Sequence, residues 1–114
     1  MEADCIFCRI AAGEIPARIV YQDDEVVAFH DVAPKAPTHV LVIPRRHIAT
    51  LAETAPEDAA LLGHAVRTAI EIAHAEGLDR GFRLVWNCGE SAGQSVFHLH
   101  LHLLGGRAMG WPPG

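Results

Sequence analysis

The segment at residues 98–103 alternates strictly between histidine and leucine, with the sequence HLHLHL. Successive side chains of a β-strand point to opposite faces of a sheet, so this alternation predicts a strand with three histidines on one face and leucines on the other. We expect the strand to run from Val96 to Leu104, with Phe97 and the leucines in the core and the histidine face open. Because a strand rises about 3.3 Å per residue, imidazoles two positions apart begin roughly 6.6 Å apart. One small anionic group could therefore meet two or three of them.

Other patterns predict four further strands and two helices. The strands are expected at residues 19–21, 26–30, 39–43 and 82–87. A short amphipathic helix is expected from Cys5 to Ala12, and a long helix from Ala55 to Glu76 with a capping box at Thr54 and Glu57. The apolar stripe of the long helix comprises Leu62, Val66, Ala69, Ile70 and Ala73. Because strands follow strands and one long helix lies between them, we expect an α+β fold with a five-stranded antiparallel sheet, in a single domain at residues 1–114.

The composition excludes several classes of function. Nine basic residues against fourteen acidic residues give a formal net charge of −5, so a nucleic-acid polymer is a poor partner. The apolar runs are far shorter than the roughly 20 residues of a membrane span, and the N-terminus lacks the pattern of a signal peptide. Three cysteines, an odd number, favour thiols or a metal site over disulfides. We therefore expect a cytoplasmic protein that contacts neither membranes nor nucleic acid.

The alternating histidines are the main candidate functional residues, because histidine titrates near neutrality and can act as nucleophile, acid or base. Two other interpretations stay open. One is a polar solvent face; the other is a catalytic metal site, although no acidic residue within the strand would complete it. The loop before the strand, residues 87–95, favours a phosphate ligand. Gly89 and Gly93 let backbone N–H groups approach closely, while Asn87 and Ser95 add neutral donors.

A second candidate site is the C-x₂-C spacing of Cys5 and Cys8. Thiols at this spacing bind zinc, form a redox pair or are simply buried, and the spacing alone does not choose among these. A thioredoxin-like redox pair is disfavoured because no βαβ pattern surrounds the two cysteines. Cys88 stands apart and has no assigned role.

The strand and its flanks resemble a known family. Residues 94–104, QSVFHLHLHLL, match at every position the signature of the histidine triad (HIT) family, His-φ-His-φ-His-φ-φ with φ apolar. Further matches are residues 6–7, 29–31 and 37–44, together with the ending at 105–107 and 111–114. The resemblance covers nearly the whole chain. The ending WPPG is typical of the Hint branch, the histidine triad nucleotide-binding proteins, and not of the longer diadenosine polyphosphate hydrolases.

The resemblance implies a purine nucleoside phosphoramidase or a related nucleotide hydrolase. In the family the middle histidine attacks the α-phosphorus of a nucleoside 5′-phosphoramidate, so His100 would become nucleotidylated before water releases the nucleoside monophosphate. His102 and His39 match the partners that bind the phosphate, orient the nucleophile and help protonate the leaving group, and Ser95 joins them as a catalytic candidate. Asp31 matches the carboxylate that accepts the ribose hydroxyls, a role that suits its several acceptor sites.

The resemblance also assigns a nucleotide pocket, a metal site and a partner. The base pocket would be lined by Ile6, Phe7, Ile10, Phe29, His30 and Val32. The nucleotide's phosphate side would meet Asn87, Gly93, Gln94, Ser95 and Val96 beside the two triad histidines. Structural zinc would be held by Cys5, Cys8, His47 and His98, as in many bacterial-type members, while several better-known Hint proteins lack this metal.

A symmetric homodimer is expected, with the strand at 82–87 pairing across a two-fold axis into a ten-stranded sheet. By the same resemblance, Trp111 would shape the leaving-group pocket of the partner subunit. Two competing hypotheses stay open beside the hydrolase. The first is a catalytically idle nucleotide-binding or regulatory scaffold. The second is a zinc-stabilised structural domain, which would leave the histidine face unexplained.

Overall fold

The computed structural model describes residues 4–114 and contains the five-stranded antiparallel sheet that the sequence predicts. Its strands are β1 (Ile19–Gln22), β2 (Val26–His30), β3 (Thr38–Pro44), β4 (Phe82–Trp86) and β5 (Leu101–Gly105). Their spatial order is β1-β2-β3-β5-β4, so β5 lies between β3 and β4. The helices are α1 (Ile6–Ala11) and α2 (Ala59–Ala75), with three-residue 3-10 turns at η1 (Leu51–Glu53), η2 (Pro56–Asp58) and η3 (Glu90–Ala92). The predicted α+β class is confirmed.

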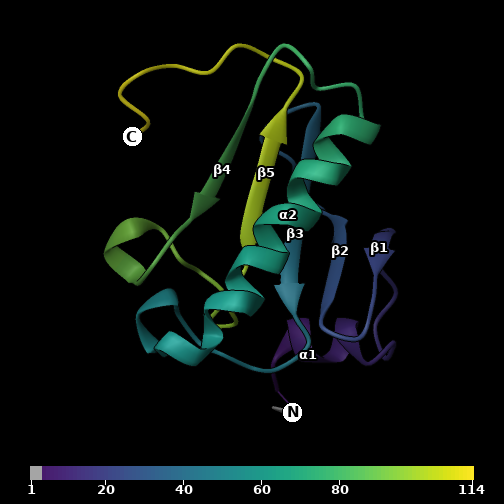
Figure 1. Cartoon of the computed structure of the whole chain (residues 1–114), viewed down its shortest axis with the longest axis vertical. Coiled ribbons are helices and arrows are strands. Elements are labelled where there is room, and N and C mark those ends of the chain that lie inside the picture. The colour runs from purple at the N-terminus through teal and green to yellow at the C-terminus, as the bar shows by residue number, and fades with distance from the viewer. Residues whose placement is uncertain (1–3) are drawn as a thin grey trace.

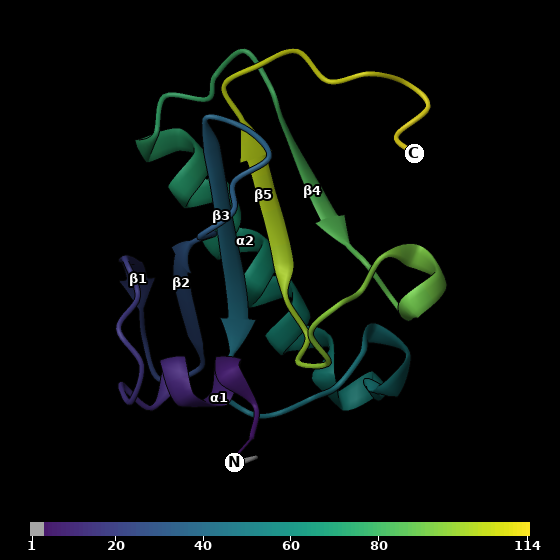
Figure 2. The ribbon, with the colours of Figure 1, turned by 180° about the vertical axis from the view of Figure 1, so that it is seen from behind.

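The sheet is covered unequally on its two faces. Helix α2 crosses one face (Figure 1), whereas α1 lies at one end of the opposite face (Figure 2). The core under α2 takes alternate residues of β2 and β3, such as Val26 and Val40, and the smaller cluster under α1 takes the residues between them, such as Phe29 and Leu41. Both central strands are therefore buried on both sides. No helix within residues 4–114 is long and apolar enough to cross a bilayer.

The histidine strand differs from the sequence prediction at its start. It begins at Leu101 instead of Val96, because the preceding segment bonds to the loop after β3: the Leu99 N–H donates to the Ile48 carbonyl. The leucines at 99, 101 and 103 are buried as predicted. Phe97 is 45% exposed and does not join the core. The histidine face is not open either, since two of its three histidines are buried and the third is half-buried.

Helix α2 also differs in its start and its rotation. The predicted capping box at Thr54 is wrong, because the Thr54 hydroxyl donates to the Leu51 carbonyl and it is the Asp58 carboxylate that accepts the Ala55 N–H. The residues that α2 buries are Ala65, Thr68, Ala69, Ile72 and Ala73. The predicted stripe was therefore partly wrong, since Leu62, Val66 and Ile70 are only half-buried. Because Ala65, Ala69 and Ala73 are small, the helix can approach the sheet closely where they face it. The larger row of Leu62, Val66 and Ile70 lies beside this contact.

Asp23, in the turn between β1 and β2, joins three elements. Its Oδ1 accepts the N–H groups of Glu25 and Val26 at 2.8 and 2.9 Å. Its Oδ2 accepts the Tyr21 hydroxyl at 2.7 Å and the His64 Nε2–H of α2 at 2.6 Å. Desolvation by burial opposes ionisation, but the hydrogen bonds outweigh it and hold the pKa of Asp23 well below its usual range.

We predict that Asp23→Ala lowers the free energy of unfolding by at least about 2 kcal/mol at pH 7, because four donors lose a charged acceptor. The depressed pKa means that the contribution of Asp23 is complete above the unfolded-state pKa of about 3.9 and is lost as the pH falls further. Urea unfolding of both proteins from pH 7 to pH 3 should show their difference shrink at the acid end. The exposed neighbour supplies the control, and a loss from Asp24→Ala as large as that from Asp23→Ala would contradict the prediction.

Candidate functional site

Two of the three alternating histidines, His100 and His102, lie near His39 of β3 and Asp31, which follows β2, on the face opposite α2. In the pairing of β3 with β5, Leu41 lies opposite His102 and His39 lies opposite Leu104, so the two histidines are diagonal neighbours on one face. His39 Nε2 lies 2.9 Å from His102 Nδ1 and 3.4 Å from Asp31 Oδ2. The ring centroids of His100 and His102 are 4.9 Å apart. The structure thus brings together His100, His102, His39 and Asp31, four of the residues expected to act on the phosphate and the ribose.

Backbone groups determine which ring nitrogens carry protons. The Lys35 backbone N–H donates to His39 Nδ1 at 3.0 Å, so the proton of neutral His39 is on Nε2, which donates to His102 Nδ1. Neutral His102 must then carry its proton on Nε2. That nitrogen is buried and has no hydrogen-bond partner within residues 4–114. A buried, unpaired N–H is costly unless a ligand accepts from it.

His100 has the opposite arrangement. Its Nδ1 lies 2.8 Å from the His98 carbonyl oxygen, which can only accept, so in the neutral ring Nδ1 carries the proton and Nε2 keeps a lone pair. The ring is buried and meets the edge of Phe7 with centroids 5.2 Å apart. The neighbouring rings of His100 and His102, with centroids 4.9 Å apart, therefore carry a lone pair and an unpaired N–H, respectively, on their Nε2 atoms. Sequence analysis could not find this arrangement, because its determinants are the backbone atoms of Lys35 and His98.

Burial keeps the hydrogen-bonded rings of His39 and His102 neutral. Desolvation, assisted by the neighbouring His100 and His39, lowers the pKa of His102 to about 4, against the opposing effect of Asp31. Burial also lowers the pKa of His39, which Asp31 partly offsets. Both rings are therefore neutral at pH 7, which the relay of hydrogen bonds requires.

The ligand atoms of Asp31, His39 and His102 lie within 4.8 Å of one another, a grouping that could hold a metal ion. The sequence argument against a catalytic metal considered only acidic residues within the histidine strand and missed Asp31, which follows β2. The hydrogen bonds nevertheless disfavour a cation here. His39 Nε2 would have to lose its proton to ligate, while Nδ1 already accepts the Lys35 N–H.

The residues predicted to line the base pocket occupy two environments. Phe7 and Phe29 are buried against each other in an edge-to-face contact with centroids 5.5 Å apart, and Ile10 packs against their cluster. By contrast, Ile6 is 48% exposed and Val32 is 99% exposed. His30 is half-buried at the end of β2. The predicted residues thus divide into a buried aromatic pair and exposed apolar side chains, and the base pocket stays a prediction.

The loop at residues 87–95 contributes less than its glycines suggest. The Gly89 N–H donates to the Gln94 side chain and the Gly93 N–H donates to the Glu90 carbonyl, so both are used within the loop. Gln94 is buried and its amide also donates to the carbonyls of Ala49 and Val96. The expectation that the two glycine N–H groups meet a ligand is therefore not met. Ser95 is exposed, whereas Asn87 and Val96 are half-buried.

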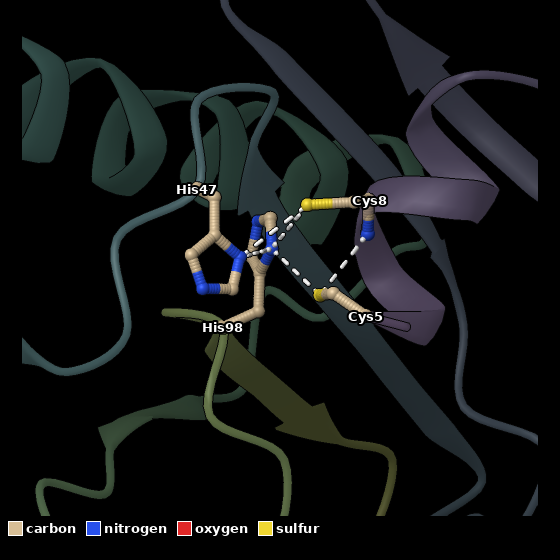
Figure 3. A group of neighbouring side chains, drawn as sticks. All are labelled: Cys5, Cys8, His47 and His98. Carbon is tan, nitrogen blue, oxygen red and sulfur yellow. Dashed lines mark hydrogen bonds between the residues drawn. The ribbon is translucent and has the colours of Figure 1, made fainter. Parts of the chain in front are cut away.

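The second predicted site also assembles in the structure. Figure 3 shows Cys5 and Cys8 of the α1 segment facing His47, from the loop after β3, and His98. His98 Nδ1 lies 3.3 Å from Cys5 Sγ, 3.4 Å from Cys8 Sγ and 3.2 Å from His47 Nδ1. Cys8 Sγ lies 3.3 Å from His47 Nδ1. These four ligand atoms could hold a metal ion.

The donor chemistry of this cluster fits a tetrahedral ion. Zinc binds thiolate sulfur at about 2.3 Å and imidazole nitrogen at about 2.0–2.1 Å, so its ligand atoms lie roughly 3.3–3.8 Å apart, close to the spacing found here. His98 Nε2 donates to the Pro44 carbonyl at 2.8 Å, which leaves Nδ1 as the acceptor that faces the thiols. Burial lowers the pKa of His98 to about 4, so the ring is neutral, as a metal ligand must be.

Trp111 lies on the C-terminal tail and is 84% exposed. The C-terminal tail extends away from the sheet beyond the β4 edge (Figures 1 and 2). The role of Trp111 in a partner's pocket stays a prediction.

Known proteins resemble this chain in fold and over most of its sequence. Residues 12–109 match the HIT domain. An uncharacterized HIT-like protein of Synechococcus elongatus is 56% identical over 114 residues, all of both chains. Among solved structures, a HIT family hydrolase from Legionella pneumophila is 52% identical with a TM-score of 0.96 over 97% of this chain and 100% of that one. A histidine triad nucleotide-binding protein from Candida albicans is 33% identical with a TM-score of 0.81, over 96% and 83% of the two chains.

The domain match and the full-length identity agree with the geometry of the three histidines, and the chain belongs to the histidine triad (HIT) family.

Proposed function

We propose that this protein is a nucleotide-binding hydrolase of the Hint branch that cleaves nucleoside 5′-phosphoramidates through a covalent nucleotidyl-histidine intermediate. One observation supports the proposal above the others: neutral His100 keeps a lone pair on Nε2, and the adjacent ring of His102, with its centroid 4.9 Å away, carries an unpaired Nε2–H. A nucleophile next to a buried donor is the arrangement that phosphoryl transfer needs. A polar solvent face would leave the burial and the missing hydrogen bond unexplained.

In the first step, His100 Nε2 forms a bond to the α-phosphorus while the phosphorus–nitrogen bond to the leaving amine breaks. The His102 Nε2–H donates to a phosphoryl oxygen and so stabilises the charge that develops there. The amine takes a proton from solvent as it leaves. In the second step, water attacks the phosphorus and gives a proton back to solvent, the bond to His100 breaks, and the nucleoside monophosphate is released.

The remaining site residues bind the nucleotide. Asp31 Oδ1 accepts the Ala33 N–H at 2.8 Å, which orients the carboxylate and leaves acceptor capacity for the ribose hydroxyls. The base stacks over the aromatic cluster of Phe7 and Phe29, with the exposed Ile6 and Val32 at its edge. Ser95, exposed beside the histidine segment, offers its hydroxyl to the phosphate.

We propose that the cluster of Cys5, Cys8, His47 and His98 holds a structural zinc ion. All four ligand positions come from the chain, which leaves no open position for a substrate, as in closed structural sites. The ion would tie α1 to the segment before β5 and thereby hold Phe7 against His100. It would supply stability and no chemical step.

We further propose a symmetric dimer in which β4 pairs with its copy into a ten-stranded sheet. β4 is an edge strand of the sheet, and Phe82 at its start is 39% exposed. The half-buried row of Leu62, Val66 and Ile70 on α2 offers further apolar surface. The tail that extends past β4 would then carry Trp111 to the partner's site.

We expect the protein to release AMP from an adenosine 5′-phosphoramidate, and His100→Ala to reduce kcat/KM by at least about 10³-fold because the nucleophile is lost. His102→Ala and His39→Ala should reduce the rate less, and a double variant should fall little below His100→Ala because these residues act as a unit. The exposed His74 on α2 supplies the control, His74→Ala. Nucleotide binding without turnover in the wild-type protein would instead indicate a scaffold.

We expect about one zinc per chain in protein purified without chelator. Chelation should lower the Tm yet leave activity in the fraction that stays folded. Cys8→Ser should lose the metal, whereas Cys88→Ser, at an exposed thiol outside the cluster, should keep it. Elemental analysis that finds no metal would end this proposal. If chelation instead abolished activity while the fold stayed intact, the interpretation as a catalytic metal site would return.

Sedimentation at micromolar concentration should give about twice the chain mass of 12.3 kDa. If Trp111 shapes the partner's leaving-group pocket, Trp111→Ala should change the preference among amine leaving groups more than the affinity for the nucleoside. A stable monomer with full activity would contradict both parts of this proposal.

A further inference from the structure

The loop between β2 and β3 is held by the turn that follows β5. Arg107 donates from Nε and Nη2 to the single carbonyl oxygen of Lys35, at 3.1 and 3.0 Å. Next to it, Gly106 has φ +90°, and a Cβ at that position would lie 2.9 Å from Cβ of Pro37. The turn therefore packs directly on the loop, with a glycine where no side chain fits.

Lys35 also contacts the hydrogen-bonded pair of His39 and His102. Its backbone N–H is the donor to His39 Nδ1 at 3.0 Å, and His39 Nε2 in turn donates to His102 Nδ1 at 2.9 Å. Arg107 thus binds the backbone carbonyl of Lys35, and His39 binds the backbone N–H of the same residue. The guanidinium is linked to the unpaired His102 Nε2–H through three successive hydrogen-bonded contacts.

We propose that Arg107 is a positioning residue for the HIT reaction: by holding the Lys35 backbone, it keeps the proton of His39, and hence that of His102, on Nε2. The inference rests on the proposed function for its kinetic consequence, but its structural claim concerns the proton positions alone. It adds to the site a residue that contacts neither the substrate nor the reacting atoms.

The direction of the relay decides what His102 presents to the phosphate. If the Lys35 N–H moves away, His39 Nδ1 becomes free to carry a proton, and Nε2 can then accept a hydrogen bond instead of donating one. His102 would have to donate from Nδ1, so its Nε2 would turn a lone pair toward the substrate. A lone pair repels an anionic phosphoryl oxygen that the N–H would stabilise.

Among the groups around His39, only the Asp31 carboxylate favours protonation of the ring. Asp31 at 3.4 Å raises the pKa of His39, whereas burial, which has the largest effect, and the nearby charges of Lys35 and His100 lower it. The fourth neighbour, His102, is neutral near pH 7. A backbone N–H directed at Nδ1 blocks the position where a second proton would bind.

An arginine suits this role because its planar fork places two donors on one acceptor. Its Nη1 donates to the Ala108 carbonyl at 3.0 Å, which fixes the fork on the tail. The side chain is exposed, so its removal should leave the sheet and the core intact. The contact can therefore be tested without unfolding the protein.

The test uses Arg107→Ala and Arg107→Lys, with Arg83→Ala as the matched control, since Arg83 donates to the tail carbonyl of Gly110 and not to the Lys35 loop. Imidazole ¹⁵N shifts would be measured by NMR at pH 7, with His39 assigned by its loss in His39→Gln. The wild-type and Arg83→Ala proteins should show His39 protonated on Nε2, whereas Arg107→Ala should show a mixture of tautomers. Arg107→Lys, which keeps the charge in a single ammonium group but loses the planar fork, should lie between them.

Kinetics on the phosphoramidate provide the second readout. Arg107→Ala should lower kcat about tenfold with KM changed less than about twofold, because the loss is of orientation and not of nucleotide contacts. An unchanged His39 tautomer in Arg107→Ala, or an equal change of the His39 tautomer in Arg83→Ala, would overturn the inference. If the wild-type protein shows no turnover while Arg107→Ala still alters the tautomer, the positioning stands and the proposed function fails.

Discussion

The antiparallel pairing of β3 with β5 is the constraint on which both candidate sites depend. The pairing sets His39 diagonally to His102 and so creates the hydrogen bond between them. At the end where β3 stops and β5 begins, the same pairing brings the loop with His47 next to the segment with His98. A slip of one residue would turn the histidines to the opposite face of the sheet and separate both groups.

The two sites are joined through His98. Its side chain faces the cysteines and His47, while its backbone carbonyl holds the proton of His100 on Nδ1. Helix α1 connects them a second time, because it carries Cys8 into the cluster and sets Phe7 against His100. An ion in the cluster would therefore stabilise the geometry of the nucleophile while remaining outside the reaction.

The sequence predicted the fold class, the strand order along the chain and the buried leucines, because periodicity records which face of a strand meets the core. It placed the start of the histidine strand too early, since contacts with a distant loop replace the sheet ladder before Leu101. It also left the proton positions undetermined. These depend on backbone groups of Lys35, His98 and Pro44, whose locations no side-chain pattern encodes. Glycines 89 and 93 misled for a similar reason, because their N–H groups bond within their own loop.

The central claim is that His100 carries the nucleotide during turnover. Acid quenching during the reaction with an adenosine 5′-phosphoramidate, followed by intact mass measurement and peptide mapping, tests it directly. The account predicts one added adenylyl group per active site, attached to His100 and released as the substrate is exhausted. A protein that turns over substrate with no adduct at any time, or with the adenylyl group on another residue, would contradict it.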